Sequence, residues 1–312
     1  MENLLFSFNT VFPLFALIII GMILKKINIL DDHYVVVANR LVYKLTLPAM
    51  VFNNIYSNRN DASSAIPALI YIFVMLTVVY LVNTYFVLRR APLNKKGVLI
   101  QNSIHSNSIL LGLPLVTNMF GNEGAAMMSM LLPATTPYYN SMAVISHALA
   151  SVNQKASVKN ILKGLASNLI IHAALLGVVF NWLNLYLPKP IETVVTDLSR
   201  MATPLALIAL GASFKVASLH SNAKYLFLGS LVRLIIVPII LVSFAVLLGF
   251  RGIELAVMMV FFAGPIAVSS FSQTQEGGGD TQFTAQLIVI TTLLSAITLF
   301  SFIFVLRSFN LI

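Results

Sequence analysis

The sequence has no cysteine and few charged residues. Without cysteine, its 312 residues can form no disulfide and bind no metal through thiolates. Charged residues make up 9% of the chain, whereas a soluble domain carries about 25%. Hydrophobic residues make up 58%, which is more than a soluble fold of this size can remove from water. Because helices in a bilayer can expose apolar side chains to lipid, the composition predicts an integral membrane protein.

Acidic residues are scarcer than basic ones, and the formal net charge is +9. In a soluble protein this excess would suggest nucleic-acid binding. Here the basic residues lie in short loops between apolar runs, a pattern that sets orientation in a membrane. We therefore expect the lipid bilayer as a partner and no nucleic acid.

Ten segments are apolar and long enough to cross a bilayer as helices of about 20 residues. They cover about residues 7–25, 34–56, 65–89, 97–119, 124–148, 161–184, 191–214, 223–249, 253–273 and 281–306. The second is the weakest, because Arg40 and Lys44 interrupt it. The connections between the segments leave no room for a soluble domain. The expected fold is an all-α membrane protein of ten helices.

Basic residues gather in the loops on one side of this topology. That side holds Lys25, Lys26, Arg89, Arg90, Lys95, Lys96, Lys155, Lys159, Lys163, Lys215 and Lys224. The other side holds Arg59, Lys189, Arg251 and Arg307. Because the side richer in Lys and Arg faces the cytoplasm, we expect a multi-pass protein of the cell membrane with both termini outside.

The two halves of the chain share landmarks in the same order, which indicates an internal repeat. Four pairs lie 156 residues apart: Gly21 and Gly177, Asn28 and Asn184, Lys44 and Arg200, Pro48 and Pro204. Pro114 and Pro265 are 151 residues apart, and Glu123 and Asp280 are 157 apart. Five helices in each half would make the repeat inverted, a pattern typical of secondary transporters. We expect repeats at 1–150 and 161–312, joined by a cytoplasmic linker at 151–160.

The fourth helix of each half combines a proline with unusual polarity. Pro114 follows the polar run that contains Asn107, and Pro265 precedes Ser269. Proline removes a backbone donor and clashes with the carbonyl four residues earlier, so each helix is expected to break at its proline. Freed backbone groups must be buried or line a wet cavity. Corresponding breaks predict a binding site, with Asn107, Pro114, Asn118, Pro265, Ser269, Ser270 and Gln273 as candidate residues.

Several motifs together resemble the auxin efflux carrier family. Asn107 to Pro114 matches its Asn-x-x-x-x-Gly-x-Pro signature and is followed by Phe-Gly-Asn-Glu-Gly. Leu-Pro-Ala-Met-Val-Phe at 47–52 and the segment 203–213 are similar to its second and seventh helices, and Gly264-Pro265 with Gly-Gly-Gly-Asp280 resembles its C-terminal end. The resemblance covers the whole chain. The long central loop of the plant members is absent, so the chain looks like a short prokaryotic member.

The resemblance implies ten helices in two inverted repeats whose fourth and ninth helices cross at their prolines. It also implies a scaffold part, an elevator-like transport part and a small organic anion such as a mono- or dicarboxylate as substrate. Asn107 takes the place of the family's substrate-contacting asparagine, whereas Ser269 stands where many members have asparagine. No cofactor is implied; coupling to a proton or sodium gradient stays open, and a homodimer is one assembly that we consider.

Lys44 and Arg200 lie inside apolar segments, where a charge is costly and often functional. If both side chains lie deep in the bilayer, two cations near the crossing would suit an anionic substrate. If the helices begin several residues later than predicted, both side chains reach the membrane interface by snorkelling. His105 and His172 are candidates for proton relays, although packing roles are the commoner use of such residues.

A carrier has three rivals. An intramembrane enzyme is suggested by Gly277-x-Gly-Asp280, which matches a motif of aspartyl proteases, but no second aspartate lies near the middle of a predicted segment to complete the pair. A non-transporting sensor or assembly protein would need a signalling domain or partner surface. A channel is also conceivable, but broken helices in repeats suit alternating access better.

Overall fold

The structure, a computed structural model, describes residues 2–57, 65–150, 169–214 and 222–312. Within these ranges the chain is almost entirely helical, and its β-structure is one isolated bridge between Ser106 and Ile266. Six helical stretches are long and apolar enough to cross a membrane: Glu2–Lys26, Asp32–Ser57, Ala65–Arg90, Lys189–Ser213, Ala223–Leu247 and Thr281–Ser308. The predicted all-α membrane class is confirmed.

The elements of the first half begin with α1 (Glu2–Lys26). They continue with α2 (Asp32–Leu41), the π-helical turn η1 (Val42–Thr46), α3 (Leu47–Ser57), α4 (Ala65–Arg90), α5 (Leu93–Asn102), the π-helical turn η3 (Ser108–Gly112) and α6 (Leu113–Ala150). The long α6 is kinked at Gly121, whose φ of 59° is one that residues with side chains rarely adopt. This kink separates the fourth and fifth predicted segments.

The second half is described from Leu169 onward. Its elements are α8 (Leu169–Trp182), α9 (Lys189–Ser213), α10 (Ala223–Leu231), the π-helical turn η5 (Val232–Ile236), α11 (Val237–Leu247), α12 (Gly252–Ala263), α13 (Ser270–Glu276) and α14 (Thr281–Ser308). The predicted linker at 151–160 lies outside the described residues. So do Arg59, Lys155, Lys159, Lys163 and Lys215, on which part of the predicted orientation rests.

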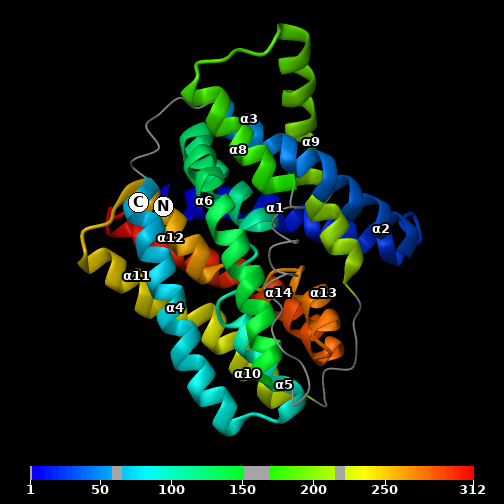
Figure 1. Ribbon diagram of the computed structural model, residues 1–312, viewed down its shortest axis with the longest axis vertical. Helices are drawn as coiled ribbons and strands as arrows, with labels where there is room; N and C mark the ends of the chain where they lie inside the picture. Colours follow the sequence, from blue (N-terminus) through cyan, green and yellow to red (C-terminus); the bar gives the residue numbers. More distant parts are fainter. Residues whose placement is uncertain (1, 58–64, 151–168, 215–221) are drawn as a thin grey trace.

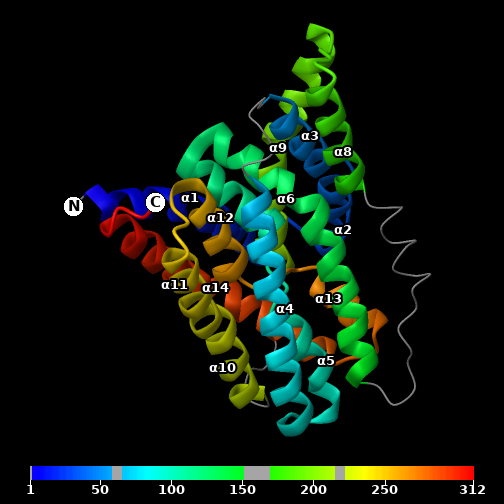
Figure 2. The same ribbon diagram turned by 60° about the vertical axis from the view of Figure 1, so that its left-hand side comes forward.

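The helices form two groups (Figures 1 and 2). One group contains α1, α2, α3, α8 and α9, in which α1 packs along α9 and α3 packs along α8. The other contains α4, α5, α10, α11, α12, α13 and α14, and α6 contacts members of both groups. The two termini lie close together, where α1 contacts α14.

Glycine allows the backbones of α1 and α9 to touch. A Cβ at Gly21 would overlap the carbonyl oxygen of Ile208, and a Cβ at Gly211 would overlap that of Ile18. Gly177 on α8 approaches α3 in the same way, with its Cβ position 3.2 Å from the carbonyl oxygen of Phe52. These small residues explain how helices without a hydrophobic driving force between them pack closely in lipid.

Local geometry matches at positions 156 residues apart. Asn28 and Asn184 both have positive φ, at 60° and 52°, and both end a helix. Ile29 N bonds to Leu24 O, and Leu185 N bonds to Phe180 O in the same way. Contacts follow the same offset, because Gly21 approaches Ile208 while Gly177 approaches Phe52.

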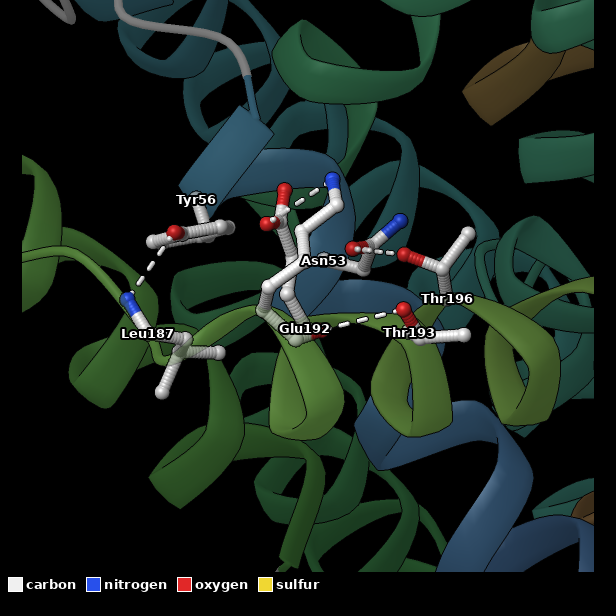
Figure 3. Close-up of polar contacts among 7 residues, drawn as sticks. Asn53, Tyr56, Leu187, Glu192, Thr193 and Thr196 are labelled. Atoms are coloured by element: carbon white, nitrogen blue, oxygen red, sulfur yellow. Dashed lines mark hydrogen bonds and ion pairs between the residues drawn. The ribbon is translucent and has the colours of Figure 1, made fainter.

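Polar contacts fasten α3 to the start of α9 (Figure 3). The hydroxyl of Tyr56 accepts a hydrogen bond of 3.1 Å from the backbone N–H of Leu187. The hydroxyl of Thr196 donates to the side-chain oxygen of Asn53 over 3.5 Å. These bonds hold the connection between α8 and α9 against the end of α3.

Candidate functional site

Two interrupted helices cross near the middle of the molecule. The first interruption lies between α5 and η3, and the second lies between α12 and α13. The two extended segments pair: Asn107 N donates to Pro265 O over 2.8 Å, and Ala267 N donates to His105 O over 3.1 Å. Backbone N–H and C=O groups that have no helical partner in these segments thus hydrogen-bond to each other, because buried backbone polar groups need partners.

The prediction that the first helix breaks at Pro114 is wrong. The break lies at residues 103–107, and Pro114 is the second residue of α6, buried within a continuous helical segment. The π-helical turn η3 precedes it, where Gly112 N bonds to Asn107 O five residues back. This wider turn gives the proline ring room that a regular α-helical turn would not. The second break does lie at its proline, Pro265.

A fully buried arginine holds the two helix ends together. Arg233, on η5, is 0% exposed. Its Nε donates to Gly264 O over 2.8 Å, and Nη2 donates to Phe261 O over 3.0 Å. Its Nη1 lies 3.2 Å from both Ser103 O and Ile104 O. The last carbonyls of a helix lack intrahelical partners, so this one guanidinium satisfies the C-terminal ends of both α5 and α12.

Sequence reasoning missed Arg233. The residue lies inside the predicted segment 223–249, where a charge is unusual enough to indicate a function. The charge was therefore visible in the sequence. The partners of Arg233 are backbone carbonyls, however, and no pattern of side chains reveals those.

A cavity of about 300 Å³ is lined by residues of both crossing segments. Its lining comes from η1, both crossing segments, η3, α6 and α8: Tyr43, Lys44, His105, Ser106, Asn107, Ser108, Ile109, Thr136, Tyr139, Asn140, Leu169, Ile170, Ala267, Val268 and Ser269. We call it the crossing cavity. Its lining contains one cation, Lys44, and no carboxylate.

Hydrogen-bond donors in this cavity are left free for a ligand. Asn107 is 3% exposed, and its side-chain nitrogen has no partner in the structure. The hydroxyl of Tyr139 is likewise buried; it lies near the backbone of Ser106 but donates to no acceptor, while its ring stacks on His105 at 4.8 Å between centroids. A buried donor without an acceptor costs about 1–3 kcal/mol, so a bound acceptor would be favoured here.

A chain of amides runs beside the cavity. Gln101 Nε2 donates to Gln273 Oε1 over 2.6 Å, and Gln273 Nε2 donates to Asn140 Oδ1 over 2.8 Å. His147 Nε2 lies 2.7 Å from Gln101 Oε1 and therefore donates to it. These bonds tie α5 and α13 to α6 and thereby fix both sides of the crossing.

Two glycines that follow α13 and one glycine on α5 enclose the His147 ring. A Cβ at Gly277, Gly279 or Gly97 would come within about 3 Å of the imidazole. Asp280 caps α14 by accepting a hydrogen bond of 2.9 Å from Phe283 N. The Gly277-x-Gly-Asp280 motif thus has a structural role, and no aspartate or glutamate whose side chain the structure describes is buried to act as its catalytic partner.

Replacing Gly277 with alanine is expected to destabilise the protein by about 1–3 kcal/mol, the usual cost of overpacking. The new methyl group would meet the His147 ring, which its bond to Gln101 holds in place. Thermal unfolding in detergent should show a lower midpoint. Gln275→Ala, exposed on the same short helix, is the control, and equal midpoints for the two variants would contradict this packing role.

The predicted site residues divide into three groups. Lining the crossing cavity are Lys44, Asn107 and Ser269. Beside it are Pro265, Ser270 and Gln273. Outside it are Pro114, Asn118 and Arg200. Asn118 Nδ2 donates to Thr10 O on α1, and the Arg200 side chain is 78% exposed and 3.9 Å from Asp197. The structure therefore brings one of the two predicted cations to the cavity.

Known proteins resemble nearly the whole chain. A family model described as a membrane transport protein matches residues 6–135 and 140–303. An uncharacterized transporter from Methanothermobacter thermautotrophicus is 27% identical over 299 residues, which cover 94% of this chain and 96% of the relative. An uncharacterized transporter from Methanocaldococcus jannaschii is 25% identical over 303 residues, covering 93% of this chain and 96% of the relative.

Proposed function

We propose that this chain, which belongs to the membrane transport protein family, is a secondary carrier that moves a small organic anion across the membrane. This family corresponds to the auxin efflux carriers that the sequence motifs resemble, so that expectation is confirmed. Family membership makes the protein a transporter and not an enzyme. The anion and the mechanism are our proposals.

The observation that carries the anion proposal is the chemistry of the crossing cavity. Its lining supplies the ammonium group of Lys44 and the free donors of Asn107 and Tyr139, with no carboxylate opposing them. The segment from Ser106 to Ile109 contains the start of the η3–α6 helix, and a helix N-terminus favours negative charge. Binding of a carboxylate would give acceptors to the Asn107 amide and the Tyr139 hydroxyl and relieve the cost of leaving these two donors buried.

We propose that the helices form two inverted five-helix repeats that work as an elevator. The matching caps at Asn28 and Asn184 and the matching glycine contacts support the repeat. The group of α1, α2, α3, α8 and α9 would be the scaffold, and the group that carries the crossing would move. The substrate would be held at the crossing of the broken helices, where transporters with such repeats bind it, and would move across the membrane with that group.

In this proposal the protein lies in the cell membrane with both termini outside. The charges that support this orientation include Arg89 and Arg90 at the end of α4, and Lys95 and Lys96 in the first turn of α5. The homodimer that we consider would leave the crossing cavity within each protomer, because a single chain supplies its whole lining.

Transport by reconstituted protein tests the proposal. Liposomes would be offered labelled mono- and dicarboxylates with and without sodium and proton gradients. We expect uptake of at least one carboxylate, and Lys44→Met should lower its initial rate by about 10-fold or more, because a hydrogen bond to a charged group is worth about 1.5–3 kcal/mol. Arg200→Met is the matched control, since this cation lies outside the cavity.

Two results would overturn the proposal. Absence of uptake of every anion under every gradient would rule out the carrier of organic anions. Equal rates for Lys44→Met and Arg200→Met would show that the crossing cavity does not hold the anion through Lys44.

A further inference from the structure

A second cavity lies on the far side of the crossing, between α4, α5, α10 and α14. Its volume is about 260 Å³. Its lining is Asn83, Phe86, Val87, Arg90, Ala91, Leu99, Asn102, Ser103, Lys224, Tyr225, Leu228, Gly229, Val232, Ile266 and Leu287. We call it the α4–α10 cavity. It shares no lining residue with the crossing cavity. It still contacts the crossing, because Ser103 and Ile266 of its lining belong to the two interrupted segments.

One side chain in this cavity lacks any partner. Asn102 ends α5 and is 3% exposed, and both its amide nitrogen and its amide oxygen are buried without a hydrogen bond. Leaving a buried polar group unpaired costs about 1–3 kcal/mol, and buried side-chain amides are normally paired. An amide that can both donate and accept thus faces a cavity with apolar walls, which points to a bound molecule with polar oxygens.

Two cations belong to the same cavity. Arg90 ends α4, and Lys224 lies in the first turn of α10. Arg90 lies over the ring of Phe86 at 5.6 Å, and Lys224 lies 5.9 Å from the centre of the Tyr225 ring. Neither has a carboxylate within ion-pair distance in the part of the chain that the structure describes. The cavity lining contains no acidic residue, so its charge suits an anion.

The surroundings indicate how a ligand would arrive. Phe86 and Leu228 line the cavity and are 47% and 42% exposed, and neighbouring Phe227 is 66% exposed. Apolar side chains exposed on a membrane protein face lipid, and cations at the ends of membrane helices lie near lipid headgroups. Basic pockets between such helices bind anionic headgroups, each cation contributing about 1 kcal/mol.

We propose that the α4–α10 cavity is a binding site for an anionic phospholipid. The phosphate lies between Arg90 and Lys224, an ester oxygen accepts from the Asn102 amide, and an acyl chain follows the apolar wall formed by Val87, Leu99 and Leu287. The site does not depend on the transported anion. A bound lipid stabilises the folded protein by mass action. It would contact the crossing segments at Ser103 and Ile266.

Purified protein in detergent tests this site. Phosphatidylglycerol is expected to raise the thermal unfolding midpoint by about 4 °C more than phosphatidylcholine does, the shift that about 1–2 kcal/mol of binding gives in a chain of this size. Native mass spectrometry should retain one phosphatidylglycerol on each chain. The double variant Arg90→Gln/Lys224→Gln should lose both effects.

The matched control is Arg89→Gln/Lys96→Gln, which removes two neighbouring cations that do not line the cavity. It should keep both effects. Equal stabilisation by phosphatidylcholine would overturn the proposal, and so would loss of the effect in the control variant. Stabilisation by soluble glycerol 3-phosphate to the same extent would also overturn it, because the ligand would then be a soluble anion rather than a lipid.

Discussion

Replacing Arg233 with methionine is expected to abolish transport and to lower the stability of the purified protein. Methionine keeps much of the side-chain length but removes every donor, so the carbonyls of Ser103, Ile104, Phe261 and Gly264 lose their shared partner. Each buried carbonyl left unpaired costs about 1–3 kcal/mol. The charge that faces the C-terminal ends of α5 and α12 also disappears, and those ends carry partial negative charge.

The lysine variant separates charge from geometry. Arg233→Lys keeps a cation, but an ammonium group lacks the planar fork that reaches two helix ends at once, so we expect only partial recovery of uptake. Arg251→Met is the control, because Arg251 also donates to backbone carbonyls, those of Val246 and Phe250, but is exposed.

Hydrogen exchange provides a readout at the crossing itself. The amides of Asn107 and Ala267, which bond across the crossing, should exchange faster in Arg233→Met than in the wild type or in Arg251→Met. If Arg233→Met transports its substrate at the wild-type rate, or if exchange at these amides is unchanged, Arg233 does not position the crossing.

The class of fold follows from the sequence for a simple physical reason. Bilayer thickness imposes a minimum length on each apolar run, and every described part of the ten predicted segments contains helix. The equivalence of Asn28 and Asn184 was also readable, and the structure gives both a positive φ, which their short polar side chain tolerates. Landmarks of this kind are local, so a sequence pattern can record them.

The position of the first break and the composition of the site could be predicted only in part. Proline marked the second break correctly. Near Pro114, a π-helical turn accommodates the proline, and the helix is interrupted earlier, in the polar run at residues 103–107. Lys44 and Arg200 were equivalent in the sequence, yet only Lys44 lines the crossing cavity. Which face of a helix meets a cavity depends on packing between distant segments, and no spacing along the chain reports it.

The close contact between α1 and α9 makes Gly211 a position where the smallest substitution should have a large effect. A Cβ at Gly211 would overlap the carbonyl oxygen of Ile18, which is backbone and cannot move by changing rotamer. We expect Gly211→Ala to lower the free energy of unfolding by about 3 kcal/mol, the upper end of the usual overpacking cost. Gly21→Ala, which meets Ile208 O, should behave alike.

Gly229→Ala is the matched control for this packing. It makes the same change inside a helix, but its nearest neighbours are the ends of the Leu287 and Leu99 side chains, at 3.0 and 3.5 Å, which can shift. Alanine favours helix over glycine by about 1 kcal/mol, so this control should be neutral or more stable than the wild type. Thermal unfolding in detergent measures all three variants. If Gly211→Ala unfolds at the same temperature as Gly229→Ala, α1 and α9 do not pack backbone to backbone, and a rigid scaffold built on that contact would have to be abandoned.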